Sequence, residues 1–215
     1  MLRWGRLEIA ETLDELVDPA STALIMWDFA TGLVSRAFNR DEFVRNAKTL
    51  VGAARECGVA VFYACQNDVA WTDVGPGLIR MRLKPISAEK IARIESVNRP
   101  GTAAAEIEPD VAPAPGDVIF GKFMPSAFLG TDLEWRLRGR GIKTLVLAGI
   151  SLETGVDGTA REAVHRGYYA VIARDACSSS SKNRYDMSVA VCDELHDVFT
   201  TNEIAGAWRK NKAAR

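Results

Sequence analysis

Two residues of opposite charge each come at the end of an apolar segment and are suited to proton transfer. Asp28 follows the apolar run TALIMW, and Lys122 ends the segment DVIFGK. A charged side chain at such a place costs free energy unless it is paired. Taken singly, a structural carboxylate and a surface lysine are the alternatives. If both segments are strands of one parallel sheet, their carboxyl ends meet at one edge. We therefore predict that Asp28 and Lys122 are catalytic, and the sequence leaves open whether Asp28 acts as acid or as base.

Three further polar residues are predicted to bind substrate because they lie at or near the same sheet edge. Gln66 and Ser151 lie at or just past the ends of apolar segments. Glu153 follows two residues later, where it has two interpretations. It could act as a second acid or base, or it could be an acidic residue that is stabilised at a helix N-terminus.

A long segment over 67–116 shows little clear periodicity and contains several proline and glycine pairs. Long irregular inserts in compact domains often serve as lids or binding loops. Trp71 and Arg80 lie in this segment, and an aromatic ring with a cation could close over a small anionic substrate. The alternative is a solvated or subunit-contacting loop.

The segments around these residues alternate between two periodicities. Apolar runs of strand length alternate with stretches that place apolar residues on one helical face. This alternation predicts a Rossmann-like α/β fold, a three-layer α-β-α arrangement with a six-stranded, mainly parallel sheet, as a single domain over 1–215. The expected strands are 22–29, 59–66, 117–122, 143–150, 168–176 and a closing segment 197–204, and the expected helices are 41–58, one beginning at Thr131, 153–167 and 183–197.

The overall composition excludes several classes of protein. The 27 basic and 28 acidic residues give a net charge of −1, whereas nucleic-acid binders usually carry a basic excess. No apolar run reaches the roughly 18 residues that a membrane span needs, and the N-terminus does not read as a secretory signal. The four cysteines form no CxxC pair, and His165 and His196 fall in predicted helices. We predict a cytoplasmic protein with reduced thiols, no metal and no cofactor.

Three segments together resemble the isochorismatase-like hydrolases, a family that includes nicotinamidases, carbamoylsarcosine amidases and isochorismatases. The first is ALIMWD, which ends in Asp28, and the second is the K-x-x-x-S-A-F motif over 122–128. The third is the segment 145–177, which is similar to the family pattern G-x-x-T-x-x-C-V-x-x-T-A and its continuation. The resemblance extends from about residue 20 to 204 and implies the family fold.

The resemblance also exposes a departure from the family. Gly155 falls where the family has its nucleophilic cysteine, and Leu152 replaces a motif threonine. The isochorismatases proper carry glycine at this place, and Gln66 resembles a glutamine of that branch. Their GVYAHIG-like motif, however, is here GISLETG, with Ser151 and Glu153. Close backbone approach, decay of the site and an engineered substitution are alternative explanations of Gly155.

The resemblance implies further features of the site. The peptide bond before Ser151 is typically cis in the family, and relatives are commonly homodimers or homotetramers. The helix that is expected to begin near Gly155 offers backbone amides, which could hold an oxyanion or a carboxylate.

Three functions are consistent with these residues. The first is hydrolysis of a small anionic metabolite by Asp28 and Lys122 without covalent catalysis, with vinyl-ether cleavage as the concrete reaction. In the isochorismatase branch, the aspartate protonates the enol-ether carbon, water adds to the cation, and pyruvate leaves. The second is hydrolysis of a small amide by water directly. The third is a decayed relative that binds a small molecule or serves as an oligomeric scaffold.

Overall fold

The computed structural model describes residues 1–67, 73–92 and 101–214, and a six-stranded sheet lies at its centre. The strand order is β5-β4-β3-β6-β7-β8, and every neighbouring pair is parallel. The predicted parallel sheet is therefore confirmed. The strands are β3 (Thr22–Trp27), β4 (Ala60–Gln66), β5 (Val118–Lys122), β6 (Thr144–Ile150), β7 (Tyr169–Ser178) and β8 (Asp197–Phe199).

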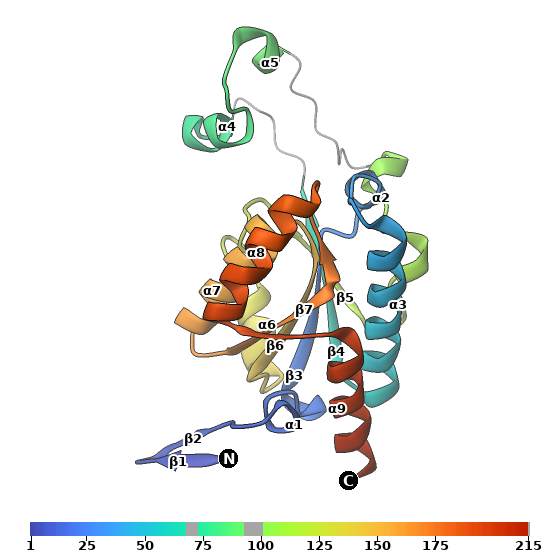
Figure 1. The fold of residues 1–215 in the computed structure, drawn as a ribbon, viewed down its shortest axis with the longest axis vertical. Helices are drawn as coiled ribbons and strands as arrows, with labels where there is room; N and C mark the ends of the chain where they lie inside the picture. Colours follow the sequence, from blue (N-terminus) through green and yellow to red (C-terminus); the bar gives the residue numbers. More distant parts are fainter. Residues whose placement is uncertain (68–72, 93–100, 215) are drawn as a thin grey trace.

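Helices cover both faces of this sheet, which gives the predicted three layers (Figure 1). One apolar cluster joins the sheet to α1, α3 and α9, and a second joins its other face to α6, α7 and α8. The helices are α1 (Leu13–Leu16), α3 (Arg40–Cys57) and α9 (Thr201–Ala213) on one side, and α6 (Leu133–Gly139), α7 (Asp157–His165) and α8 (Lys182–Leu195) on the other.

The central strand β3 shows why its sequence is continuously apolar. All six of its residues are buried. Leu24 and Met26 belong to the cluster on the α3 side, whereas Ala23, Ile25 and Trp27 belong to the cluster on the α7 side. Because successive side chains of a strand point to opposite faces, a strand that is covered on both faces buries every position, and in β3 only the first residue, Thr22, is polar.

The predicted helix over 41–58 is confirmed as α3, which begins at Arg40 and ends at Cys57. Gly58 follows in the left-handed conformation at φ 77° and caps the helix, as C-terminal glycines commonly do. The six residues that were predicted to share its apolar face are all buried: Phe43, Val44, Ala47, Leu50, Val51 and Ala54.

Two predicted helix starts on the α6–α7 side were wrong. Asp132, and not Thr131, precedes α6, while the Thr131 hydroxyl accepts a hydrogen bond from Leu133 N at 3.3 Å. The single helix expected over 153–167 is divided into a π-helical turn, η5 (Leu152–Val156), and α7.

The predicted closing segment 197–204 was also wrong in its extent. Strand β8 ends at Phe199, and α9 then begins at Thr201. The side chains of Thr200 and Glu203 form a capping box at this helix start, which is the sequence signal that the strand interpretation missed.

The insert 67–116 contains short helices in its described parts. They are α4 (Pro76–Arg82), α5 (Ala88–Ala92) and the 3₁₀ turns η3 (Ala103–Ala105) and η4 (Pro109–Val111). In Figure 1, α4 and α5 lie beyond the end of the sheet that also carries α2 (Thr31–Val34). A small hairpin of β1 (Leu2–Trp4) and β2 (Leu7–Ile9) extends from the opposite end.

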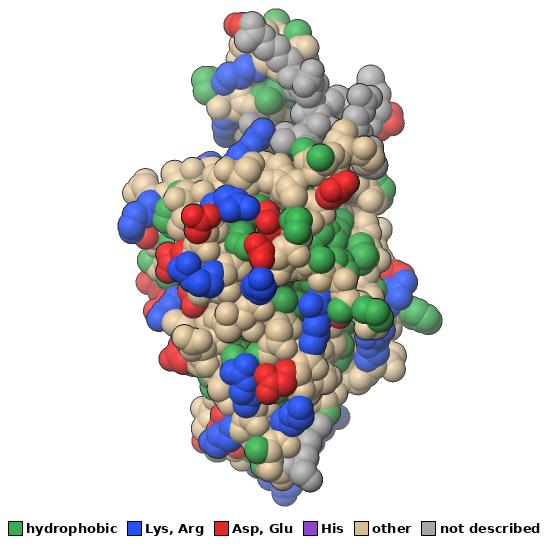
Figure 2. Space-filling model, turned by 90° about the vertical axis from the view of Figure 1, so that its right-hand side faces the viewer, with side chains coloured by type: hydrophobic (Ala, Val, Ile, Leu, Met, Phe, Trp, Pro, Cys, Tyr) green, Lys and Arg blue, Asp and Glu red, His purple; other side chains and the backbone are tan. Residues whose placement is uncertain are grey.

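The surface carries charges of both signs. On the face that Figure 2 shows, Lys and Arg side chains are interspersed with Asp and Glu side chains, so no field of a single sign covers it. This mixture agrees with the near-neutral composition. Among the described residues, no helix is long and apolar enough to cross a membrane.

Candidate active site

Asp28 and Lys122 meet at the carboxyl edge of the sheet, as their positions in the sequence predict. Lys122 Nζ donates a hydrogen bond to Asp28 Oδ2 at 2.8 Å, and the two side chains are 2% and 3% exposed. Asp28 leaves β3 with φ 50°, a left-handed conformation that aspartate tolerates better than most residues, and its backbone N donates to Ala64 O. The carboxylate thus stays at the sheet edge while the chain turns away.

Trp27, the residue before this aspartate, forms the base on which the lysine rests. Lys122 Nζ lies 3.7 Å from the centroid of the Trp27 ring, within the range of a cation–π interaction. The indole is itself fixed, because its Nε1 donates a hydrogen bond to Pro125 O at 3.2 Å. Trp27 was not predicted from the sequence to be a site residue.

The same indole also packs against Gly155. A Cβ atom placed on Gly155 would lie 1.9 Å from Trp27 Cζ2 and 2.0 Å from Cη2, a distance that no side chain can occupy. Gly155 is buried, and only a glycine allows η5 to approach the ring of β3 this closely. The close-approach explanation of this glycine therefore agrees with the geometry.

The expected backbone amides near Gly155 are engaged elsewhere. Gly155 N and Val156 N both donate to the carbonyl oxygen of Ser151, at 3.2 and 3.3 Å. The suggestion that these amides are free to hold an oxyanion was wrong, because the π-helical turn uses them internally. The peptide bond between Ile150 and Ser151 is cis, as the resemblance implies.

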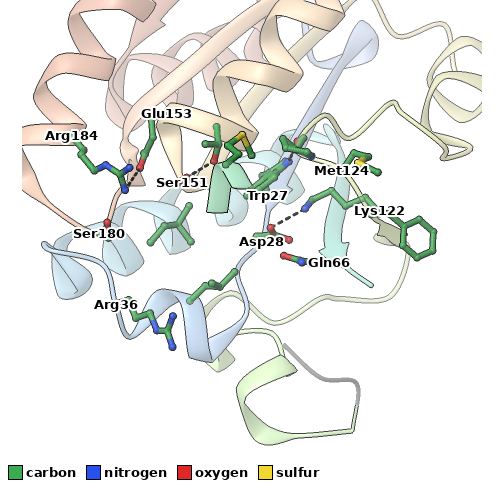
Figure 3. A pocket seen from close by; sticks show the side chains of 16 residues that line it. Trp27, Asp28, Arg36, Gln66, Lys122, Met124, Ser151, Glu153, Ser180 and Arg184 are labelled. Carbon is green, nitrogen blue, oxygen red and sulfur yellow. Dashed lines mark hydrogen bonds and ion pairs between the residues drawn. The ribbon is translucent and has the colours of Figure 1, made fainter. Parts of the chain in front are cut away.

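A cavity of about 300 Å³ opens above these residues, a volume suited to a small metabolite (Figure 3). Gln66 and Ser151 both line it, as their strand-end positions suggested. Arg80 is exposed on α4 and is not among the lining residues, although its neighbour Met81 is. Trp71 lies outside the described residues. In the described part of the chain, the charged residues of the lining are Asp28, Arg36, Lys122, Glu153 and Arg184.

Glu153 forms a second charged group in this lining. Ser179 Oγ donates to Glu153 Oε1 at 2.9 Å, and Arg184 Nη1 lies 3.7 Å from the same oxygen. The other oxygen, Oε2, is buried without a hydrogen-bond partner among the described residues. Glu153 was predicted from the sequence, whereas Arg36 and Arg184 were not. Arg184 lies in the first turn of α8, the helix that follows β7, and not at the end of a strand. The expectation that site residues lie at strand ends therefore does not identify it.

None of the four cysteines is poised as a thiolate near neutral pH. Burial, with the charge of Asp28, raises the pKa of Cys65 to about 11, and burial raises that of Cys192 to about 12. Burial also raises the pKa of Cys57 and Cys177. Within the described ranges, no group of three or more His, Cys, Asp or Glu side chains could hold a metal ion.

Comparisons with known proteins agree with this fold and these motifs. The family model of the isochorismatase domain matches residues 22–203. The chain is 35% identical to the isochorismatase family protein YecD of Escherichia coli O157:H7 over 173 residues, which cover 79% of this chain and 86% of that protein. It is 30% identical to the ureidoacrylate amidohydrolase RutB of Methylobacterium radiotolerans over 177 residues, 74% of this chain and 68% of RutB.

Solved structures show the same fold at lower identity. A cysteine hydrolase from Pseudomonas syringae pv. phaseolicola superposes with a TM-score of 0.77 at 23% identity, covering 91% of this chain and 96% of the other. The nicotinamidase PncA of Bacillus subtilis gives 0.68 at 24% identity, covering 83% and 98%. With the family model matched over most of its length, this chain belongs to the isochorismatase family of hydrolases.

Proposed function

We propose that this chain hydrolyses a small anionic metabolite with water as the direct nucleophile. Asp28 transfers the proton, Lys122 fixes the carboxylate by its 2.8 Å hydrogen bond, and no covalent enzyme intermediate forms. In this proposal Gly155 stands at the position of the family's nucleophilic cysteine, and Gln66, Ser151 and Glu153 contact the substrate.

The packing of Trp27 against Gly155 is the observation that carries the proposal. The ring atoms of Trp27 lie where a side chain at position 155 would begin. A cysteine changed to glycine in an unaltered thiol-bearing site would leave a gap of side-chain size. Here an indole fills that space and also supports Lys122, which favours a site built around glycine over an engineered or decayed one.

The thiols give no substitute nucleophile. The charges of Asp28 and Lys122 affect the pKa of Cys65. This pKa is about 11, which leaves the thiol protonated at neutral pH. A protonated thiol is a poor nucleophile, since the thiolate is the reactive form.

Vinyl-ether cleavage is the reaction that fits these groups best. Asp28 relays to the terminal enol carbon a proton that it takes from the Lys122 ammonium, its hydrogen-bond donor at 2.8 Å, and the oxygen of water adds to the resulting cation. A proton of that water returns to Asp28, and the hemiketal breaks its C–O bond to give a keto acid and an alcohol. This route develops positive charge on the substrate, so it needs no oxyanion site.

Amide hydrolysis is the second candidate, and the similarity to ureidoacrylate amidohydrolases favours it. Water would then attack a carbonyl carbon while Asp28 accepts its proton. This route develops an oxyanion, which preorganised donors usually stabilise. The amides of Gly155 and Val156 already donate to Ser151 O, so these two amides are not free for that role.

A catalytic role also accounts for the buried charges better than a scaffold role does. Burying a carboxylate and an ammonium is rarely worth more to stability than packing apolar residues in their place. A buried ion pair that faces a cavity is therefore more often retained for chemistry.

Parallel assays of two substrates test the proposal. Isochorismate is followed by pyruvate release through lactate dehydrogenase, and ureidoacrylate by ammonia release. We expect pyruvate release that Cys65→Ser and iodoacetamide leave within about twofold and that Asp28→Asn abolishes. Loss of activity in Cys65→Ser, or a covalent adduct trapped on the enzyme during turnover, would overturn the direct role of water. Ammonia release without pyruvate release would replace vinyl-ether cleavage by amide hydrolysis.

A further inference from the structure

The cavity has a second charged end that the proposed chemistry does not use. In Figure 3, Glu153, Arg184 and Arg36 lie on one side of the pocket and Lys122 on the other, with Asp28 between them. The topology explains this separation: Lys122 ends β5, Asp28 follows β3, and the residues that contact Glu153 follow β7. At about 4.8 Å per strand, β3 and β7 are roughly 10 Å apart.

The charges of the lining do not cancel. Among the described residues, three cations and two carboxylates line the cavity. Asp28 is paired with Lys122, and Glu153 lies near Arg184. Arg36 makes no ion pair with the part of the chain that the structure describes, and it comes from a different element, the turn that follows α2. One positive charge among these residues thus remains to attract an anionic ligand.

Arg184 and Arg36 are suited to a carboxylate. A guanidinium presents several N–H donors in a plane that matches the two oxygens of a carboxylate. The Arg184 side chain is 64% exposed, and its 3.7 Å separation from Glu153 is longer than a hydrogen bond. It can therefore turn toward a ligand anion without breaking a strong contact.

Glu153 supplies the complementary feature, an acceptor. Its Oε1 accepts from Ser179, which is fully buried and fixes the carboxylate in place. Its Oε2 is buried without a hydrogen-bond partner in the described chain, and the side chain is 19% exposed. A buried carboxylate oxygen is normally satisfied, and Glu153 lines the cavity, so a ligand donor is the fitting partner once the carboxyl group turns toward the cavity.

We propose that this end of the cavity, formed by Glu153, Arg184 and Arg36, selects the substrate: Glu153 accepts a hydrogen bond from an N–H or O–H group, and the two arginines bind a carboxylate. That the bound molecule is a substrate rests on the proposed function. The geometry narrows the class of substrate to small acids that carry a hydrogen-bond donor near the carboxylate. The hydrogen-bond donor and the carboxylate lie at one end of the substrate, and the bond to be cleaved lies at the other end, toward Asp28.

Calorimetric binding to the intact protein tests this, because it does not depend on turnover. Three compounds of similar length separate the features: N-acetyl-β-alanine has an amide donor and a carboxylate, hexanoate has the carboxylate alone, and N-propylacetamide has the amide alone. We expect N-acetyl-β-alanine to bind at least tenfold more tightly than either of the others.

The variants assign the features to residues. Arg184→Gln and Arg36→Gln should each weaken N-acetyl-β-alanine and hexanoate roughly tenfold to hundredfold, as loss of a charge-assisted hydrogen bond does, and leave N-propylacetamide unchanged. Glu153→Gln should weaken the two amides and leave hexanoate unchanged or tighter. Arg45→Gln, an exposed arginine of α3 outside the cavity, is the matched control and should bind like the wild type.

Two results would overturn the inference. One is no measurable binding of N-acetyl-β-alanine, and the other is binding that Arg184→Gln, Arg36→Gln and Glu153→Gln leave within twofold of wild type. Failure of the proposed function looks different: the binding pattern would hold while neither isochorismate nor ureidoacrylate is hydrolysed. Conversely, hydrolysis without this binding pattern would retain the function and remove the inference.

Discussion

The two ends of the cavity contain the same kinds of groups under different conditions. At each end a carboxylate lies beside a cation. Asp28 and Lys122 are 3% and 2% exposed and 2.8 Å apart, whereas Glu153 and Arg184 are 19% and 64% exposed and 3.7 Å apart. Charges attract more strongly where water is excluded, and exposed pairs are screened.

This difference separates two tasks. A buried pair is held in one geometry and cannot exchange partners without leaving a charge unpaired, which suits proton transfer at a fixed position. An exposed pair opens at little cost, which suits recognition of a ligand that must enter and leave. The comparison predicts that changes at the buried end affect both folding and activity, while changes at the open end affect binding alone.

The largest effect is expected for Asp28→Asn. The substitution preserves shape but leaves the Lys122 ammonium buried without its counter-charge, so the free energy of unfolding should fall by about 3–5 kcal/mol. Activity should fall by roughly 10²- to 10⁴-fold, as loss of a general acid or base does. Urea unfolding and kcat/KM measure the two effects.

Asp186→Asn on α8 is the control for this variant. Asp186 pairs with Lys182 at 2.7 Å, but both side chains are more than half exposed. It should unfold within about 1 kcal/mol of wild type. An equally small loss for Asp28→Asn would mean that the buried pair is not the stronger one, and the contrast between the two ends would fail.

Gly155→Ala should have the next largest effect. The added Cβ meets the Trp27 ring, which is held by Pro125 O and lies beneath Lys122, so the ring cannot move freely. Overpacking of this kind lowers the free energy of unfolding by about 1–3 kcal/mol. Chemical denaturation measures it, and kcat should fall as well because Lys122 rests on the displaced ring.

Gly158→Ala provides the matched substitution three residues later. Nothing lies within 4 Å of a Cβ at Gly158, so alanine should be neutral or stabilise α7 by up to about 1 kcal/mol. A double-mutant cycle with Trp27→Phe should show coupling, because the smaller ring relieves part of the clash. If the two alanine variants were equally stable, the packing of Trp27 against Gly155 would be disproved.

A smaller effect is expected from alkaline pH, through the thiol beside the buried pair. The pKa of Cys65 is raised to about 11 because burial disfavours the thiolate. An unfolded chain ionises this thiol near its ordinary pKa of 9.0, while the folded chain retains the proton. The contribution to stability is therefore complete below pH 9 and is lost as pH rises from about 9 to 11, by about 1–2 kcal/mol.

Urea unfolding at pH 8, 9, 10 and 11 measures this loss, and Cys65→Ser should make the pH dependence shallower over that interval. Tyr63 and Cys192, whose pKa values are raised to about 12, contribute at higher pH and remain in the variant. If Cys65→Ser left the pH dependence of stability unchanged, the pKa of this thiol would not be raised by burial in the folded chain.

The sequence predicted those features that depend on local patterns and on the order of strands. The apolar runs located the strands, and the strand-end rule placed Asp28 and Lys122 at one edge. The run around Asp28 was nevertheless assigned two residues too many. Phe29 is apolar because it stacks on Phe43 at 5.0 Å, and not because it belongs to the strand.

The features that the sequence could not supply depend on contacts between distant elements. Alternation along β3 places Trp27 on the α7 face, but the ring meets Gly155 only because η5 winds as a π-helical turn. In the same turn, the amides of Gly155 and Val156, which were expected to be free, donate to Ser151 O. Arg36 and Arg184 come from elements far apart in the sequence, and only the folded arrangement brings them to one cavity.

The smallest effect on stability is expected for Arg184→Gln, and it completes the comparison. The pair with Glu153 is long and its arginine is largely exposed, so the free energy of unfolding should change by less than about 1 kcal/mol. The half-buried Glu153 carboxylate keeps its hydrogen bond from Ser179 in the variant, so it is not left without a partner. Measured in the same urea experiment as Asp28→Asn, this variant should differ from it by several kcal/mol although both remove one charge from the cavity. A loss of 3 kcal/mol or more would show that the open end is structural, and a substrate-selecting role for Arg184 would then need another basis.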